Sequence, residues 1–106
     1  MVVDHELNEL KKEFLQEAAD KTREIESMLT VDLSSQTLDR LAYLAHQLKG
    51  SGGSYGYQRI SDNAAELEKA FESLAGGEER DGLDGVIREN ATALTEEIEQ
   101  QLRELE

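Results

Sequence analysis

The residues best suited to chemistry lie close together near the middle of the chain, where His46 is followed three positions later by Lys49. A neutral imidazole is a competent nucleophile and can accept a phosphoryl group. If the segment is helical, Lys49 lies one turn from the ring, where its ammonium group can offset the charge of the transferred oxygens. The pair is therefore compatible with phosphoryl transfer, in which His46 would be the nucleophile and Lys49 an electrostatic aid.

Three glycines, Gly50, Gly52 and Gly53, follow directly after this pair. Each costs about 1 kcal/mol relative to alanine inside a helix, so their presence needs a reason. One interpretation is a helix whose ridge without side chains lets another protein approach the imidazole. The other is that the helix ends at Lys49 and a flexible loop runs from there to Ser54. The local pattern favours neither, and a single surface histidine is weak evidence of function.

Apolar residues recur along the chain at steps of three and four, the spacing that places them on one face of a helix. This pattern predicts helices over residues 4–29, 35–55, 58–75 and 81–105. Four amphipathic helices with short connections most simply form an up-down-up-down bundle, so we expect an all-α fold and a single domain over residues 1–106. The predicted core stripes consist of Leu7, Leu10, Phe14, Ala18, Ile25 and Met28; Leu38, Leu41, Ala45, Leu48, Gly52 and Tyr55; Ile60, Ala64, Leu67, Phe71 and Leu74; and Leu83, Ile87, Leu94, Ile98, Leu102 and Leu105.

The second of these helices carries His46. Ser34 or Ser35 can cap its start by accepting a free backbone N–H, and Gly56 can end it. At about 100° per residue, His46 lies roughly 130° from the mean direction of the apolar stripe, so we expect the ring to face water. Its neighbours on that outward face are Ala42, Lys49, Gly50 and Gly53.

Charge and composition exclude several kinds of partner. The formal net charge of −13 would repel nucleic-acid phosphates and anionic lipids, and no basic patch offsets it. No apolar run approaches the length of a membrane span, and Met1 to Glu9 lack the pattern of a signal peptide. We therefore expect no nucleic acid, no membrane and, because cysteine is absent, a cytoplasmic protein. Two histidines and no cysteine make a metal site a poor interpretation, and we interpret His5 as a surface residue.

The residues from His46 to Gly56, HQLKGSGGSYG, resemble the signature of the histidine phosphotransfer (HPt) domain family, which is H-x-[LI]-K-G followed by small residues and a later glycine. The resemblance implies a four-helix bundle in which His46 lies in the middle of a helix and is phosphorylated. It also implies that Lys49 assists the phosphoryl group and that Gly50 leaves room for a partner. The family tends to carry Gln or Glu twenty-two residues after the histidine, where it can orient the imidazole, and that position here is Glu68.

This resemblance also implies the reaction and its partners. His46 would take a phosphoryl group from the aspartyl phosphate of a receiver domain and pass it to another receiver aspartate. The implied partners are response-regulator receiver domains and a sensor histidine kinase, and we expect a monomer. No cofactor is expected on this chain, because the magnesium ion would belong to the receiver. The residues expected to line the docking surface are Ala42, Tyr43, Gly50 and Gly53.

Two alternative functions stay open. The chain also resembles the histidine-bearing module of chemotaxis-type kinases, which a separate ATP-binding domain phosphorylates, and Glu68 is compatible with that role. The other alternative is a non-catalytic helical adaptor, in which the glycines only pack a partner helix and His46 has no chemical role. Autokinase activity is not expected, because the chain lacks the phosphate-binding motif G-x-x-x-x-G-K-[ST].

Overall fold

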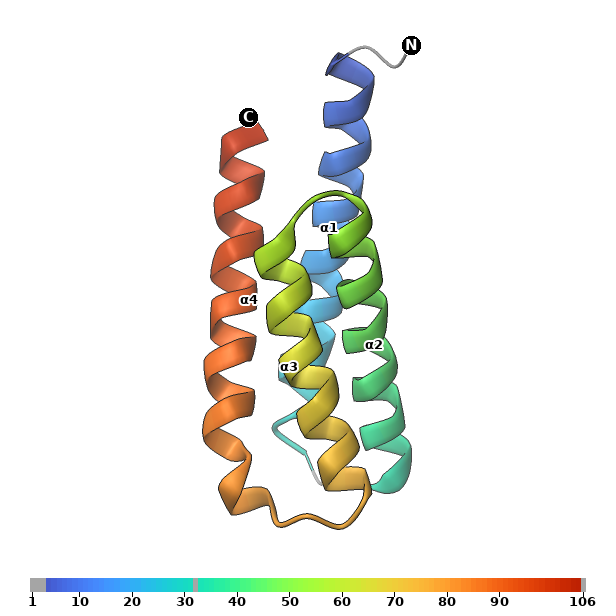
Figure 1. The fold of residues 1–106 in the computed structure, drawn as a ribbon, viewed down its shortest axis with the longest axis vertical. Helices are drawn as coiled ribbons and strands as arrows, with labels where there is room; N and C mark the ends of the chain where they lie inside the picture. Colours follow the sequence, from blue (N-terminus) through green and yellow to red (C-terminus); the bar gives the residue numbers. More distant parts are fainter. Residues whose placement is uncertain (1–3, 32, 106) are drawn as a thin grey trace.

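The computed structural model describes residues 4–31 and 33–105, which form four α-helices and one short 3-10 helix. Successive α-helices run antiparallel, with α3 beside α2 and α4, and with α1 packed against α4 and α2 (Figure 1). The predicted all-α, up-down-up-down four-helix bundle is therefore confirmed. The elements are α1 (Asp4–Met28), α2 (Ser35–Ser54), α3 (Gln58–Ala75), η1 (Arg80–Gly82) and α4 (Asp84–Leu105).

Helix α2 continues through the glycine-rich segment. Its first turn is capped by the hydroxyl of Ser34, which accepts a hydrogen bond from the backbone N–H of Thr37 at 3.2 Å. Its end is set by Gly56, whose φ of 84° is a left-handed conformation that glycine adopts without strain. The N–H groups of Gly56 and Tyr57 donate to the carbonyls of Gly53 and Gly52 at 3.1 and 2.8 Å, which satisfies the last carbonyls of the helix. The alternative of a loop after Lys49 is therefore wrong.

The last helix begins later than the apolar pattern indicated. Residues Arg80–Gly82 form one turn of 3-10 helix, closed by a hydrogen bond from the N–H of Leu83 to the carbonyl of Arg80 at 2.9 Å, and α4 begins at Asp84. The predicted start at residue 81 is therefore wrong by about one turn. Short 3-10 turns often precede an α-helix, and the spacing of apolar residues does not distinguish the two.

Side chains from all four α-helices form one apolar core, and most positions of the predicted stripes are buried. Leu7 and Leu10 are exposed, contrary to the prediction, because the first turns of α1 extend past the turn that joins α2 to α3 (Figure 1). Other stripe residues lie half-buried at the margin of the core: Met28, Tyr55, Leu74, Leu83, Leu102 and Leu105. Buried residues that the stripes did not include are Leu15, Thr22, Leu44, Ala70 and Ala91.

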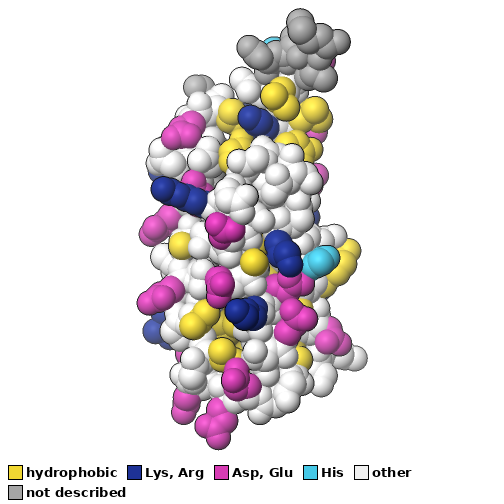
Figure 2. All heavy atoms as spheres, in the orientation of Figure 1, with side chains coloured by type: hydrophobic (Ala, Val, Ile, Leu, Met, Phe, Trp, Pro, Cys, Tyr) yellow, Lys and Arg dark blue, Asp and Glu magenta, His cyan; other side chains and the backbone are white. Residues whose placement is uncertain are grey.

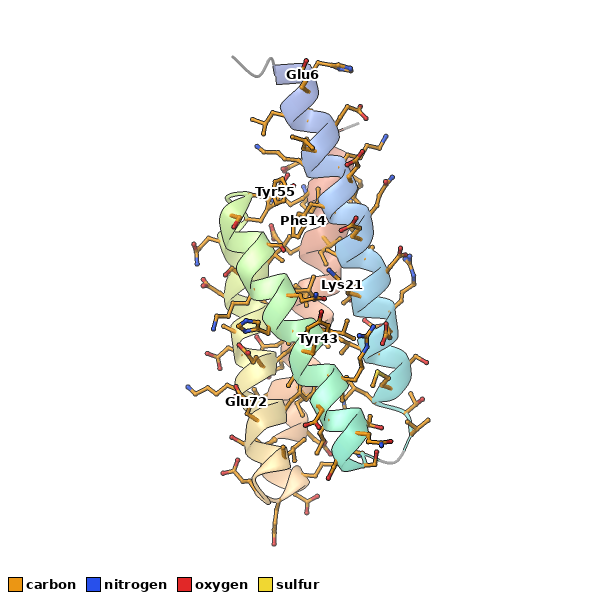
Figure 3. All side chains as sticks on the ribbon, turned by 90° about the vertical axis from the view of Figure 1, so that its right-hand side faces the viewer. Glu6, Phe14, Lys21, Tyr43, Tyr55 and Glu72 are labelled. Carbon is orange, nitrogen blue, oxygen red and sulfur yellow. The ribbon has the colours of Figure 1, made fainter. Side chains whose placement is uncertain are left out.

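An aromatic stack fixes the turn after α2 against α1. The ring of Phe14 stacks against those of Tyr55 and Tyr57, with centroid distances of 5.0 and 5.9 Å and nearly parallel planes. Figure 3 shows Phe14 and Tyr55 extending toward each other from α1 and from the end of α2. Such stacked pairs add about 0.5–1.5 kcal/mol to the burial of apolar surface. The end of the histidine-bearing helix is therefore held by packing as well as by backbone hydrogen bonds.

Candidate functional site

His46 lies on the side of α2 that faces away from the core, as the stripe geometry predicted, and its side chain is 66% exposed. Figure 2 shows a histidine side chain at the edge of the molecule, with basic, acidic and hydrophobic side chains beside it. The Nδ1 atom of His46 lies 2.8 Å from Oε2 of Glu68. The imidazole is therefore open to solvent but held at one of its two nitrogens.

Helix α3 supplies Glu68 at the margin of its core-facing side, directly after the fully buried Leu67. The side chain of Glu68 is only 16% exposed, and its carboxylate faces two residues of α2. One oxygen faces His46, and the other accepts a hydrogen bond from the Nζ atom of Lys49 at 3.3 Å. The fold thus brings together His46, Lys49 and Glu68, three residues that the sequence singled out.

The contact with Glu68 determines which ring nitrogen can react. An ionised carboxylate only accepts hydrogen bonds, so the proton of a neutral His46 must lie on Nδ1. The lone pair then lies on Nε2. Because the ring is largely exposed, an incoming group can reach it from solvent. The arrangement therefore leaves Nε2 as the ring nitrogen whose lone pair could act as a nucleophile.

Gly52 faces α3 inside the bundle rather than a partner. A Cβ atom at this position would lie 3.1 Å from Cγ2 of Ile60 and 3.1 Å from the backbone nitrogen of Ser61. The hydroxyl of Ser61 donates to the carbonyl of Lys49 at 2.8 Å, a contact between α3 and α2 that the sequence pattern did not reveal. The interpretation of all three glycines as a ridge for a partner is therefore wrong for Gly52, which allows α2 and α3 to pack closely.

Gly50 and Gly53 remain on the exposed surface of α2. A Cβ atom at Gly50 would meet nothing within 4 Å, and one at Gly53 would meet only the hydroxyl oxygen of Ser61 at 3.7 Å. Internal packing therefore does not require glycine at either position. Because neither residue has a side chain, nothing protrudes from α2 at these two positions beside His46.

The two other residues expected at the docking surface differ in exposure. Ala42 is half-buried and packs against the core, so little of it is available to a partner. Tyr43 is 51% exposed, one turn before His46 on the same side of α2. Figure 3 shows its position midway along the face of α2. The aromatic ring and the imidazole are thus neighbours on one surface.

Within residues 4–31 and 33–105, no group of three or more His, Asp or Glu side chains is arranged to hold a metal ion. In the same part of the chain, no helix has the length and apolar character needed to cross a membrane.

Comparison with known proteins identifies one family. The family model described as "Hpt domain" matches residues 9–106, which include His46, Lys49 and Glu68. The match begins within α1 and covers α2, α3 and α4 completely. No curated protein and no solved structure matches the chain.

Proposed function

The chain belongs to the Hpt domain family and so has a phosphotransfer role in two-component signalling, and on that premise we propose that His46 is its phosphoryl carrier. The observation that supports this most directly is the exposed imidazole held through Nδ1 by Glu68 at 2.8 Å. We infer that His46 accepts the group from the aspartyl phosphate of one receiver domain and passes it to the aspartate of another.

In this reaction, the Nε2 lone pair of His46 attacks phosphorus. The N–P bond forms as the bond between phosphorus and the aspartyl oxygen breaks, and the electron pair of that bond stays on the receiver carboxylate. The imidazole becomes positively charged while it keeps its proton on Nδ1. Glu68, 2.8 Å from that nitrogen, offsets the charge and keeps the ring in place. Transfer to the second receiver is the same step in reverse.

Lys49 is proposed to assist the phosphoryl group. Its Nζ atom lies 3.3 Å from Oε1 of Glu68 in the structure, and its flexible side chain is 46% exposed. Rotation of that side chain lets the ammonium group face the transferred oxygens once they are bound to Nε2. A magnesium ion belongs to the receiver in this proposal, and this chain supplies only the nucleophile and its surroundings.

The receiver is proposed to dock on the outward surface of α2. Gly50 and Gly53 present backbone without side chains beside His46, and Tyr43 adds an exposed aromatic ring. A receiver must bring its aspartyl phosphate within bonding distance of Nε2, and a low surface permits that approach.

The first experiment is a phosphotransfer assay with a phosphorylated receiver domain from the same organism. Wild type and His46→Gln are incubated with the labelled receiver, and the acid and alkali stability of the label on this chain is measured. We expect acid-labile, alkali-stable label on wild type alone, because phosphohistidine has that stability.

Two other results would point to the alternatives. Label from ATP and a separate histidine-kinase ATP-binding domain, with none from receivers, would identify the chemotaxis-type module. No label from either donor, together with unchanged signalling by His46→Gln, would favour the adaptor.

A further inference from the structure

Tyr43 is exposed, but its hydroxyl group and its ring each contact another residue of α2. The Nε2 atom of Gln47 donates a hydrogen bond to the phenol oxygen at 2.7 Å. The guanidinium carbon of Arg40 lies 5.7 Å from the centre of the ring, within the range of a cation–π contact. An exposed tyrosine without such contacts samples several rotamers, whereas this ring has two partners from its own helix.

Arg40 is itself held by a second helix. Its Nε and Nη2 atoms donate to the two carboxylate oxygens of Glu24 on α1, at 2.7 and 3.1 Å. A two-point pair between a guanidinium and a carboxylate fixes the plane of the guanidinium as well as its position. Glu24 therefore limits the movement of Arg40, and Arg40 limits the movement of Tyr43.

The two rings on the outward side of α2 are thus supported from opposite sides. Glu68 on α3 holds His46, and the pair of Glu24 and Arg40 supports Tyr43 from the α1 side. When an interface side chain is flexible in the free protein, binding must restrict its rotamers, and this loss of entropy lowers affinity. A large aromatic side chain that is already ordered avoids part of that loss, and tyrosine and arginine are common anchors of protein interfaces.

We propose that Tyr43 is the anchor residue for the receiver domain and that Glu24 and Arg40 are positioning residues that hold it in place for docking. This inference rests on the proposed function of His46. The chemistry of transfer depends on His46 and Glu68, whereas affinity for the receiver depends on the support of Tyr43 from α1.

The test separates docking from chemistry by using two donors. Transfer from a phosphorylated receiver domain is measured as a function of receiver concentration, and labelling by phosphoramidate, a small donor that needs no docking surface, is measured beside it. Tyr43→Ala is expected to raise the apparent KM for the receiver by about tenfold or more, and Glu24→Gln by about threefold to tenfold. In Glu24→Gln, the maximal transfer rate and the labelling by phosphoramidate are expected to stay at wild-type values.

A double-variant cycle shows whether Glu24 acts through Tyr43. In the Tyr43→Ala background, Glu24→Gln is expected to change the apparent KM no further, because the ring it supports is gone. Tyr43→Phe keeps the ring over Arg40 and is expected to retain most of the affinity. Arg59→Ala is the matched control, because it removes an ion pair between the exposed Arg59 of α3 and Glu97 of α4, away from this surface.

Each remaining result has a defined meaning. A wild-type apparent KM for Glu24→Gln, or equal losses for Glu24→Gln and Arg59→Ala, would overturn the positioning role while leaving the function of His46 intact. Failure of wild type to accept phosphate from any receiver, despite labelling by phosphoramidate, would overturn the proposed function and this inference together.

Discussion

Glu68 binds the Nδ1 side of the His46 imidazole from a neighbouring helix at 2.8 Å, while the rest of the ring is open to solvent. This relationship fixes a tautomer and places a negative charge beside the ring without blocking it. An exposed histidine alone would interconvert between two neutral tautomers. The contact therefore gives His46 a fixed tautomer that an ordinary surface histidine lacks.

The charge of Glu68 can be tested separately from its hydrogen bond. In Glu68→Gln, the amide oxygen can still accept from Nδ1, so the tautomer is kept, but the positive charge that develops on His46 loses its counter-charge. We expect the rate of transfer from a saturating receiver to fall by about fivefold, because hydrogen bonds to charged groups exceed neutral ones by roughly 1 kcal/mol. Single-turnover transfer kinetics measure the rate, and nitrogen NMR of the ring reports the tautomer. An unchanged rate with an unchanged tautomer would show that the charge has no role.

Gly50 provides a test of access to the imidazole. We expect Gly50→Gln to block transfer from the receiver, because the new side chain lies on the surface that the receiver must approach. The same change should raise the free energy of unfolding by about 0.5–1 kcal/mol, because glycine is a poor helix former and the position is open. Transfer assays and urea unfolding measure the two effects. Wild-type transfer by Gly50→Gln would contradict the steric explanation of this glycine.

Substitution of Gly52 should lower the free energy of unfolding, whereas substitution of Gly50 should raise it. The added methyl group of Gly52→Ala would lie 3.1 Å from both Ile60 and the backbone of Ser61, and neither can move freely because Ile60 is fully buried. We expect a loss of about 1–3 kcal/mol in the free energy of unfolding, reduced in part by the better helix propensity of alanine. Thermal unfolding followed by circular dichroism measures it, and Gly53→Ala serves as the comparison. A stabilised Gly52→Ala protein would show that α2 and α3 can separate at little cost.

The pair of Glu24 and Arg40 makes a contribution to stability that depends on pH. The hydrogen bonds from Arg40 lower the pKa of the Glu24 carboxyl below its ordinary value, and the same contact raises the pKa of Arg40. A carboxyl whose pKa is lower in the folded state stabilises the fold above its unfolded pKa and loses that contribution as pH falls through the folded pKa. We expect wild type to be slightly more stable than Glu24→Gln at pH 7, with the difference vanishing at strongly acidic pH. The effect is small because both side chains are about half exposed. A difference that persists in acid would have another cause.

Much of the fold follows from sequence because it depends on local periodicity. The four helices and the outward direction of His46 follow from the spacing of apolar residues alone. Glu68 could be singled out only through the family resemblance, because nothing in the stripe of α3 distinguishes it from other glutamates. Capping chemistry is local as well, so the sequence predicts Ser34 or Ser35 at the start of α2 and Gly56 at its end, and the structure places the cap at Ser34.

What the sequence did not reveal depends on distances between helices. The apolar stripe places Gly52 on the core side of α2 and Gly50 on the outward side, but only the separation of α2 from α3 shows that a Cβ atom at Gly52 would meet a neighbouring backbone. The exposure of Leu7 depends on how far α1 extends past its neighbours. The pair of Glu24 and Arg40 joins residues of different helices, which no periodic pattern specifies.

Gly52 does not contact the imidazole, yet its lack of a side chain has a chemical consequence. It permits α2 and α3 to pack closely, and this close packing brings the Glu68 side chain of α3 within reach of His46 on α2. The choice between two ring nitrogens therefore depends partly on the separation of two helix backbones, nearly two turns away from the ring. A substitution that widens this contact is therefore expected to change the reactivity of His46 without altering His46, Lys49 or Glu68.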